Sequence, residues 1–458
     1  MRAARTAPIG GGKAMIRRIG RRELIGGGAA AASLLVLPGK APAQGGAKPL
    51  AGVNLNVSCW SAAYPKYLAD YIPEFEAATG AKVTYDTPSF PVYNQRMDVE
   101  LSTGGSTYDV INVTFIYSGR WIGAGWVTPL DDYIKDPKKT PADWGGDDFL
   151  EGVAGQLRDK QGRLCGVPWI ADIYMAGTTH NEIVQKLGGM PDTLDALEGM
   201  LKKAGKLPDM AGFVAENHYG WTFISFLMSY GGMVFRNPPD DLTPVLDTPE
   251  AIAAADYYGN LLRNYGPDGV LSYVYDQVVQ MLKQGKALYS TNNQMFLVQM
   301  AGKDSKVAET CGFSMFPAGP KGRYPQVATH GWGIPTGSKQ KDAAWEFIKW
   351  AMSKQMTQRM FVEKHYSSVA RRSVIEGPDF KKALTLNGFD VGKMYVDTIE
   401  MAGKGYMKYR TVPVYPQVDR EIDAAIQAVV SQQKSAKEAM QTAQANSLEQ
   451  LKRAGVKL

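Results

Sequence analysis

The chain has 458 residues, of which 45% are hydrophobic and 21% are charged, an ordinary globular composition for a protein of more than one lobe. No run approaches the roughly 18 uncharged apolar residues that a membrane-spanning helix needs. The formal net charge of +6 comes from residues 1–43, which hold eight Lys or Arg residues and one acid, and the remainder is close to neutral. A near-neutral body argues against nucleic acid or an anionic membrane as partner.

The basic head has the layout of an export signal. Arg21 and Arg22 precede an apolar stretch at 24–37, and 41-APA-43 supplies the small residues typical of a cleavage site. The arginine pair predicts a twin-arginine signal peptide in residues 1–43, with an ordinary general-secretory leader as the alternative. No cysteine directly follows the leader, so a lipid anchor is not expected. These features predict a soluble protein of the periplasm.

From residue 53 onwards, strand patterns alternate with helix patterns. The order strand, helix, strand, helix, strand is predicted for 53–60, 65–80, 82–87, 91–103 and 109–114 in turn. Such strand–helix–strand units indicate a largely parallel sheet with helices on both faces.

The alternation resumes after 162–179, which reads as two extended runs separated by Pro168. Helices are then predicted near 181–187, 193–205, 219–230, 248–264 and 276–284, and strands at 286–291 and 312–317. Trp332 follows in a predicted loop, between two glycines that we expect to leave one face of its indole open. An amphipathic helix comes after this loop, and a long helix with an apolar stripe begins near Pro416.

The usual catalytic constellations are missing from the sequence. The four histidines and three cysteines are too dispersed for a metal motif, and there is no nucleophile elbow or phosphate-binding loop. The segment 331-GWGIPTG-337 is one residue off the dinucleotide fingerprint, and its helix starts too late. We therefore expect no enzyme, no cofactor and no metal.

Aromatic residues beside polar ones are abundant at predicted strand ends and loops. The ligand-contact candidates of this kind are Trp60, Tyr64, Tyr117, Trp169, Asp172, Tyr174, Trp221 and Trp332. In open parallel sheets, ligands bind at the carboxyl ends of strands. Aromatic faces combined with carboxylates and amides suit a sugar, whose C–H faces lie on the ring while its hydroxyls are held by polar groups. For each aromatic residue, packing in the core is the competing interpretation.

Several stretches together carry a family resemblance. They are 67-YLADYIPEFEAATGAKV-83, 109-DVINVTFIYSGRWIGAGWVTPLDDYI-134, 162-GRLCGVPWIADIYMAGTTHNEI-183, 283-KQGKALYSTNN-293 and 331-GWGIPTGSKQKDAAWEFIKWA-351. In this order and spacing the chain resembles the extracellular solute-binding proteins of the carbohydrate class, the receptors of ABC importers, and is distantly similar to maltose-binding protein. The resemblance covers residues 50–450.

The resemblance implies the two-lobed α/β fold of type II periplasmic binding proteins. Each lobe is expected to be a mostly parallel sheet flanked by helices, joined to the other by hinge crossings near 170–174, 327–332 and 366–372. Lobe 1 would comprise 44–171 plus 330–370, and lobe 2 would comprise 172–329 plus 371–458.

The resemblance also implies particular ligand contacts. Asp172, four residues after Pro168, matches the family's acidic contact, and the turn at Asn292 and Asn293 matches another. Met295 stands where the maltose protein has an aromatic residue, and its late C-terminal tryptophan is missing near Ile422. These departures favour a smaller sugar or a polyol. Arg371 is a further candidate, with a solvated surface arginine as the alternative.

The function that follows is binding without turnover. A small sugar or polyol would bridge the two lobes of a monomer, and the closed form would dock on the permease subunits of an ABC importer. Two alternatives stay open at this stage: a binding protein for a non-sugar solute, and an exported carbohydrate-active enzyme, which would need two convergent carboxylates.

Overall fold

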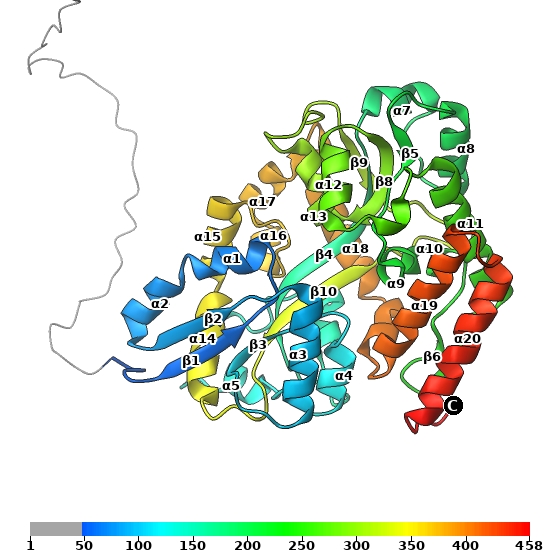
Figure 1. Ribbon diagram of the computed structural model, residues 1–458. Helices are drawn as coiled ribbons and strands as arrows, with labels where there is room; N and C mark the ends of the chain where they lie inside the picture. Colours follow the sequence, from blue (N-terminus) through cyan, green and yellow to red (C-terminus); the bar gives the residue numbers. More distant parts are fainter. Residues whose placement is uncertain (1–47) are drawn as a thin grey trace, which may run out of the picture. The chain divides into compact units, whose positions relative to one another are not determined.

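The computed structural model describes residues 48–458. The predicted export signal, residues 1–43, lies outside this range. Within it, strands and helices alternate along most of the chain (Figure 1).

A central sheet of eight strands organises the fold, in the order β2-β1-β3-β10-β4-β8-β5, with β9 also paired to β4. Its strands are β1 (Asn54–Ser58), β2 (Lys82–Asp86), β3 (Val110–Val113), β4 (Val167–Thr178), β5 (Ala211–Phe213), β8 (Ala287–Asn293), β9 (Gly312–Met315) and β10 (Val327–Gly333). Two small hairpins lie outside it: β6 (Phe235–Asn237) with β7 (Asp241–Pro244), and β11 (Thr385–Leu386) with β12 (Phe389–Asp390).

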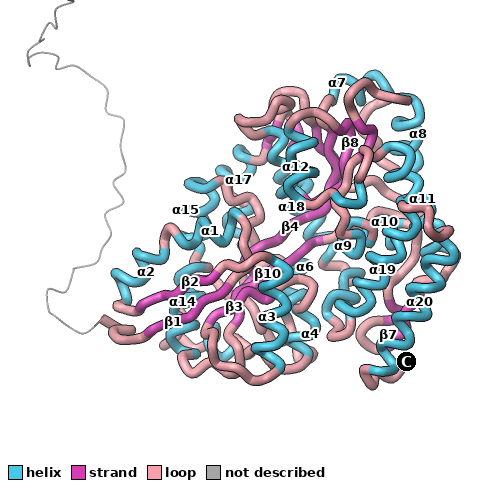
Figure 2. The backbone as a smooth tube through the Cα atoms, viewed as in Figure 1, coloured by secondary structure: helices cyan, strands magenta, loops and turns pink. Residues whose placement is uncertain are grey.

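The long strand β4 divides this sheet into two halves. Up to Ile173 it pairs with β10, and from Tyr174 it pairs with β8. We call β2, β1, β3, β10 and the start of β4 the first half, and the end of β4 with β8, β9 and β5 the second half (Figure 2). The outer pairs β1–β2, β1–β3 and β5–β8 are parallel, as the sequence predicts, whereas β4 and β10 pair antiparallel with their neighbours.

Helices cover both halves. With the first half lie α1 (Ala63–Ala69), α2 (Ile72–Thr79), α3 (Phe90–Ser102), α4 (Ser118–Gly123), α5 (Asp131–Lys135), α6 (Glu151–Ala154), α14 (Lys341–Ala351) and α15 (Lys354–Lys364). With the second half lie α7 (Asn181–Leu187), α8 (Leu194–Ala204), α9 (Tyr219–Thr222), α10 (Ile224–Ser229), α11 (Pro249–Tyr265), α12 (Tyr275–Lys283), α13 (Gln294–Leu297), α19 (Tyr415–Val430) and α20 (Ala436–Arg453).

The remaining helices follow the return of the chain past residue 366. They are α16 (Arg372–Ile375), α17 (Pro378–Ala383) and α18 (Val391–Ala402). Short 3-10 turns are η1 (Ala142–Trp144), η2 (Gly155–Leu157), η3 (Val270–Ser272), η4 (Val298–Ala301) and η5 (Tyr406–Thr411). Helix α18 packs on α6 of the first half and on β9 of the second, and η5 packs on α4 and α19, so this segment contacts both halves.

Two predicted helices are divided in the structure. The helix predicted over 65–80 breaks at Tyr71, because Pro73 has no N–H to donate and its ring collides with the preceding turn of an unbroken helix. The helix predicted over 219–230 is divided at Phe223 into α9 and α10. The long C-terminal helix is confirmed as α19, and its apolar stripe of Val418, Ile422 and Ile426 is buried.

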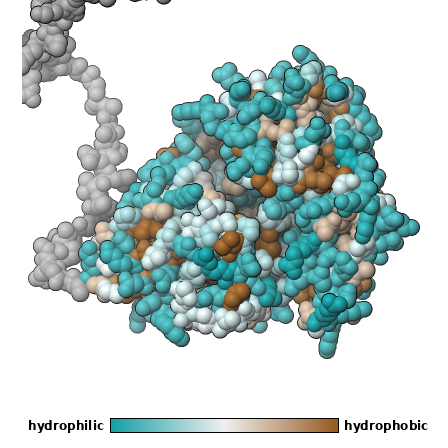
Figure 3. Space-filling view, in the orientation of Figure 1, coloured by the Kyte–Doolittle hydropathy of each residue, from teal (hydrophilic) through white to brown (hydrophobic). Residues whose placement is uncertain are grey.

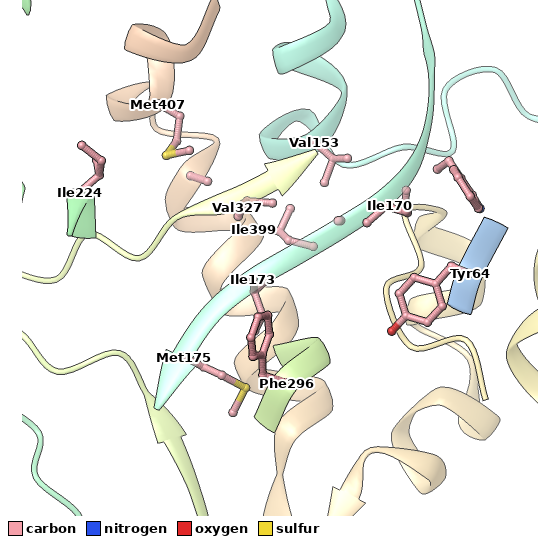
Figure 4. Close-up of a cluster of buried hydrophobic side chains, with 14 of the residues drawn as sticks. Tyr64, Val153, Ile170, Ile173, Met175, Ile224, Phe296, Val327, Ile399 and Met407 are labelled. Atoms are coloured by element: carbon pink, nitrogen blue, oxygen red, sulfur yellow. The ribbon is translucent and has the colours of Figure 1, made fainter. Parts of the chain in front are cut away.

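Strand β4 runs through the middle of the core, and all twelve of its residues are buried. Its side chains Ile170, Ile173 and Met175 belong to one hydrophobic cluster with Val327 of β10 and Ile399 of α18 (Figure 4). The strand that joins the two halves is therefore fully enclosed in the core.

Candidate ligand-binding site

Asp172 lies on β4 where the strand passes from the first half to the second, and it is only 4% exposed. Its carboxylate accepts a hydrogen bond from Ser368 of the return segment. Ser368 in turn receives the Nε2 group of Gln294 from α13 at 2.7 Å and lies 3.4 Å from the hydroxyl of Tyr64 from α1. Side chains from four segments that are distant in the sequence thus meet at the hydroxyl of Ser368.

Burial raises the pKa of Asp172 from its ordinary value of 3.8 to about 7, and the hydrogen bond from Ser368 opposes this shift. No basic side chain forms an ion pair with Asp172 in residues 48–458. A buried carboxyl group without a cation is costly to ionise. The free-energy cost of ionising Asp172 falls when a ligand supplies further hydrogen-bond donors.

A second polar group is built around Trp60, directly after β1. Its indole Nε1 lies 3.1 Å from Oδ1 of Asn112 on β3 and 3.2 Å from Nδ1 of His330 on β10. Burial lowers the pKa of His330 to about 3, and the positive charge of Arg410 contributes to this shift. His330 is therefore neutral, and its ring has one donor and one acceptor nitrogen.

Aromatic rings from both halves of the sheet meet beside this group. Trp221 of α9 contacts Phe90 of α3 and Phe115, which follows β3, edge to face at centroid distances of 5.8 and 5.2 Å. His218 stacks on the other side of Trp221 at 4.4 Å. Tyr117 is half-buried and packs against the same cluster. These contacts join α9 of the second half to the strand ends of the first half.

The end of β5 adds an acidic residue that the sequence analysis missed. Glu216 is 3% exposed, and its carboxyl group has no hydrogen-bond or ion-pair partner among the described residues. Its backbone is held on either side, because Val214 N–H donates to Tyr289 and Asn217 N–H donates to Tyr273. Burial raises the pKa of Glu216 to about 8. No strand was predicted at 211–213, so Glu216 was not recognised as following the end of a parallel strand.

Tyr174 is the next site candidate along β4. It lies two residues beyond Asp172 on the same face of β4 and pairs with Asn293 at the end of β8. Burial raises the pKa of Tyr174, and the negative charges of Glu216 and Asp172 add to this effect. The Asn293 side chain caps α13 by accepting from Phe296 N–H, while Asn292 points to the other face of its strand and has a buried, unpaired Nδ2.

The structure contradicts the open indole face predicted for Trp332. The residue lies in β10 rather than in a loop, is fully buried, and stacks on Trp169 at a centroid distance of 4.8 Å. The flanking glycines serve close packing, since a Cβ atom on Gly333 would lie 2.8 Å from Cγ1 of Val127. Trp169 is equally enclosed, with Tyr366 on its far side. Both tryptophans are core residues of the first half.

Arg371 is also placed away from the ligand candidates. It is fully buried and pairs with Asp148 at 3.1 Å, and its Nε donates to the carbonyl of Met352. The guanidinium lies over the rings of Trp144 and Phe149, at 4.7 Å from each centroid. It fastens the return segment to the first half, which excludes both the cleft contact and the solvated surface position considered for it.

A different buried arginine, Arg410 of η5, borders the aromatic cluster. Its guanidinium lies 4.7 Å from the centroid of Phe115, Nε donates to the Tyr409 hydroxyl at 3.0 Å, and Nη2 donates to Gln326. Its Nη1 is buried without a partner. No sequence pattern indicates this residue, because η5 lies near the site only as a result of how the C-terminal segment folds.

A surface cavity of about 660 Å³ lies elsewhere, between α2, η1 and α14. It is lined by side chains such as Phe75, Trp144 and Trp350 and contains neither Asp172 nor Glu216. The face drawn in Figure 3 is mostly hydrophilic, with apolar side chains in small separate groups. The buried, incompletely partnered polar groups around β4 are therefore the stronger candidates for a ligand site.

Residues 48–458 offer neither a membrane span nor a metal-binding cluster. No helix in this range combines the length and the hydrophobicity needed to cross a bilayer. No group of three or more His, Cys, Asp or Glu residues in it is arranged to hold a metal ion.

Comparisons with known proteins agree with this architecture. Among curated proteins, the erythritol/L-threitol-binding protein of Mycolicibacterium smegmatis is 23% identical over 402 residues, covering 79% of this chain and 83% of the relative. The mannitol-binding protein of Pseudomonas aeruginosa is 24% identical over 386 residues, covering 80% and 85%. A solute-binding protein of Agrobacterium radiobacter in complex with ribitol superposes with a TM-score of 0.77 at 22% identity, covering 88% of this chain and all of that one.

These structural neighbours confirm the predicted fold class, that of the two-lobed type II periplasmic binding proteins. The family model described as "Bacterial extracellular solute-binding protein" matches residues 61–358, which is well over half of the chain. This chain therefore belongs to the bacterial extracellular solute-binding proteins.

Proposed function

We propose that this protein is the sugar or polyol receptor of an ABC importer, with a small polyol as its preferred kind of ligand. The observation that carries the proposal is the convergence of Asp172, Tyr64, Gln294 and Ser368 from four separate segments. Such a convergence suits a ligand group that needs precise hydrogen bonding at this point. Relatives that bind erythritol, mannitol and ribitol support the choice of ligand class.

In this proposal the ligand lies between lobe 1, residues 44–171 plus 330–370, and lobe 2, residues 172–329 plus 371–458. Trp60 and Tyr117 belong to the first lobe, and Trp221 and Tyr174 belong to the second. Asp172 accepts hydrogen bonds from ligand hydroxyls, and Asn293 lies beside Tyr174 at the end of β8. Trp169, Trp332 and Arg371 are left out of the binding surface because the core encloses them.

Ligand binding would favour a closed arrangement of the lobes through contacts that only the closed form makes. Trp221 already bridges to Phe90 and Phe115, so its ring can cover a ligand from the side of α9. The closed form would then present its surface to the permease subunits, and the receptor would act as a periplasmic monomer that binds without turnover.

A thermal-shift screen of the protein against erythritol, ribitol, D-mannitol, D-glucitol, maltose and a set of amino acids tests this proposal. A ligand that binds only the folded state raises the melting temperature by mass action. We expect the polyols to give the largest shifts. Shifts from amino acids alone would favour a receptor for another solute, and release of shortened products from oligosaccharides would favour an enzyme.

A further inference from the structure

Three polar side chains of the site are short of hydrogen-bond donors. We call Asp172, Glu216 and Gln294 the acceptor wall. Glu216 receives no hydrogen bond in the described part of the chain, and Oε1 of Gln294 is buried without a partner. The carboxylate of Asp172 receives one hydrogen bond, from Ser368. Each member therefore has acceptor capacity that the protein leaves unused.

The orientation of Gln294 follows from the hydrogen-bond chain. The single hydroxyl proton of Ser368 goes to Asp172, so Ser368 must accept from its other neighbours. Gln294 consequently offers its Nε2 group to Ser368, at 2.7 Å, and its carbonyl oxygen Oε1 remains free. The unpaired atom of this amide is thus an acceptor.

The two acids of the wall, Asp172 and Glu216, also have no ion-pair partner in the described part of the chain. The buried guanidinium of Arg410 is bonded to Gln326 and Tyr409 and lies over Phe115, and its Nη1 has no partner among the described residues, but it forms no ion pair with either acid. Ionising two buried carboxyl groups without a cation lowers the stability of the folded protein. The positive charge of an incoming cation would offset this loss.

Both acids act on the same pair of tyrosines. Burial raises the pKa values of Tyr174 and Tyr275, and the charges of Asp172 and Glu216 both add to the shifts. Glu216 follows β5, which pairs with β8, and Tyr174, two residues beyond Asp172, pairs with Asn293 at the end of β8, so both acids lie near this strand end. Tyrosine faces attract cations as well as covering C–H groups.

We propose that the acceptor wall receives the ammonium group of an aminated polyol. This inference rests on the proposed polyol-binding function and specifies the ligand within it. An ammonium group carries three donors, no acceptor and one positive charge, whereas a hydroxyl is both donor and acceptor and is neutral. The ammonium group matches the wall in donor count and in charge, and the hydroxyls along the rest of the ligand bind as in a neutral polyol.

The test uses matched pairs of neutral and aminated ligands in isothermal titration calorimetry near neutral pH. The pairs are ribitol, D-mannitol and D-glucitol, each with its 1-amino-1-deoxy derivative. We expect the amine of at least one pair to bind about tenfold more tightly than its parent, as a charge-assisted pair allows. Glu216→Gln should reduce this ratio to about one, whereas the exposed control Glu400→Gln should preserve it.

A second measurement does not depend on a variant. Repeating the titration in two buffers of different ionisation enthalpy reports the protons released on binding. Since the ammonium group favours the ionised form of the wall, the amine should release more protons than its parent. Equal or tighter binding of the neutral members would overturn the ammonium proposal and leave polyol binding intact. If no member of any pair binds, the ammonium proposal fails, and the wider ligand screen decides separately whether polyol binding fails with it.

Discussion

Replacing Trp332 by alanine tests whether this residue stabilises the core or binds the ligand. In the sequence it stands out because it lies between two glycines. The indole is fully buried between Trp169 and the edge of Phe347. Its neighbours cannot easily close a gap, because Gly331 and Gly333 already bring the backbone of β10 close to Val127 and to the carbonyl of Val167. The alanine variant would therefore retain most of the cavity.

Truncating a buried tryptophan to alanine costs about 3–5 kcal/mol of unfolding free energy. With an unfolding entropy of roughly 2.1 cal/mol/K per residue over about 400 residues, this loss lowers the melting temperature by roughly 4–6 °C. Trp332→Phe should cost much less. Nε1 of Trp332 has no hydrogen-bond partner, so phenylalanine removes an unsatisfied donor while keeping an aromatic ring in contact with Trp169.

Urea unfolding measures the stability of each variant, and calorimetry with the best polyol from the ligand screen measures its affinity. We expect Trp332→Ala to lose stability while the folded protein keeps its dissociation constant within about twofold. Trp350→Ala, at a half-buried tryptophan of the same lobe, is the matched control and should lose less. A Trp332→Ala protein with wild-type stability and weakened ligand binding would refute the assignment of this residue to the core.

Three further predictions concern the charged groups. Asp172→Asn should weaken polyol binding by about 10–100-fold in calorimetry without lowering stability, because the amide oxygen can still accept from Ser368; unchanged affinity would remove this residue from the site. Glu216, with a pKa of about 8 when folded and an ordinary value of 4.5, holds its proton more tightly in the folded state. Stability should therefore fall as pH rises from about 4.5 to 8, and denaturation profiles of Glu216→Gln should show a shallower fall than the wild type; identical profiles would contradict this. Arg371→Met leaves Asp148 without its partner and should cost about 3–5 kcal/mol in urea unfolding with no change in ligand affinity; a loss of affinity at full stability would return Arg371 to the binding surface.

The fold followed from the sequence because its periodic elements are local. The runs 53–60, 82–87 and 109–114 became β1, β2 and β3, and the parallel pairing predicted for them is present. The break at Tyr71 shows how a single proline overrides an apolar pattern that continues through it.

The candidate site was harder to predict, because it depends on which segments meet. Asp172 and Trp221 were named from their surroundings in the sequence, and the structure places both among side chains from other segments. Glu216 and Arg410 were missed, since nothing in their neighbouring residues reports how deeply they are buried. The open indole face predicted for Trp332 was wrong because glycine neighbours are compatible with either an open ring face or a crowded backbone. Only the distances to Val127 and Val167 decide between the two.

Because β10 lies in the middle of the sheet, the first half cannot be completed until β10 has been synthesised. His330 on β10 meets Asn112 on β3 across 218 positions of the chain. At about 5–20 residues per second, a ribosome needs roughly 10–40 s between the two, and during that time the edge of β3 has no native partner. The amino-terminal part of the molecule is synthesised first but can be completed only late. A chaperone that binds nascent strands would therefore have to remain bound longest to the amino-terminal segment.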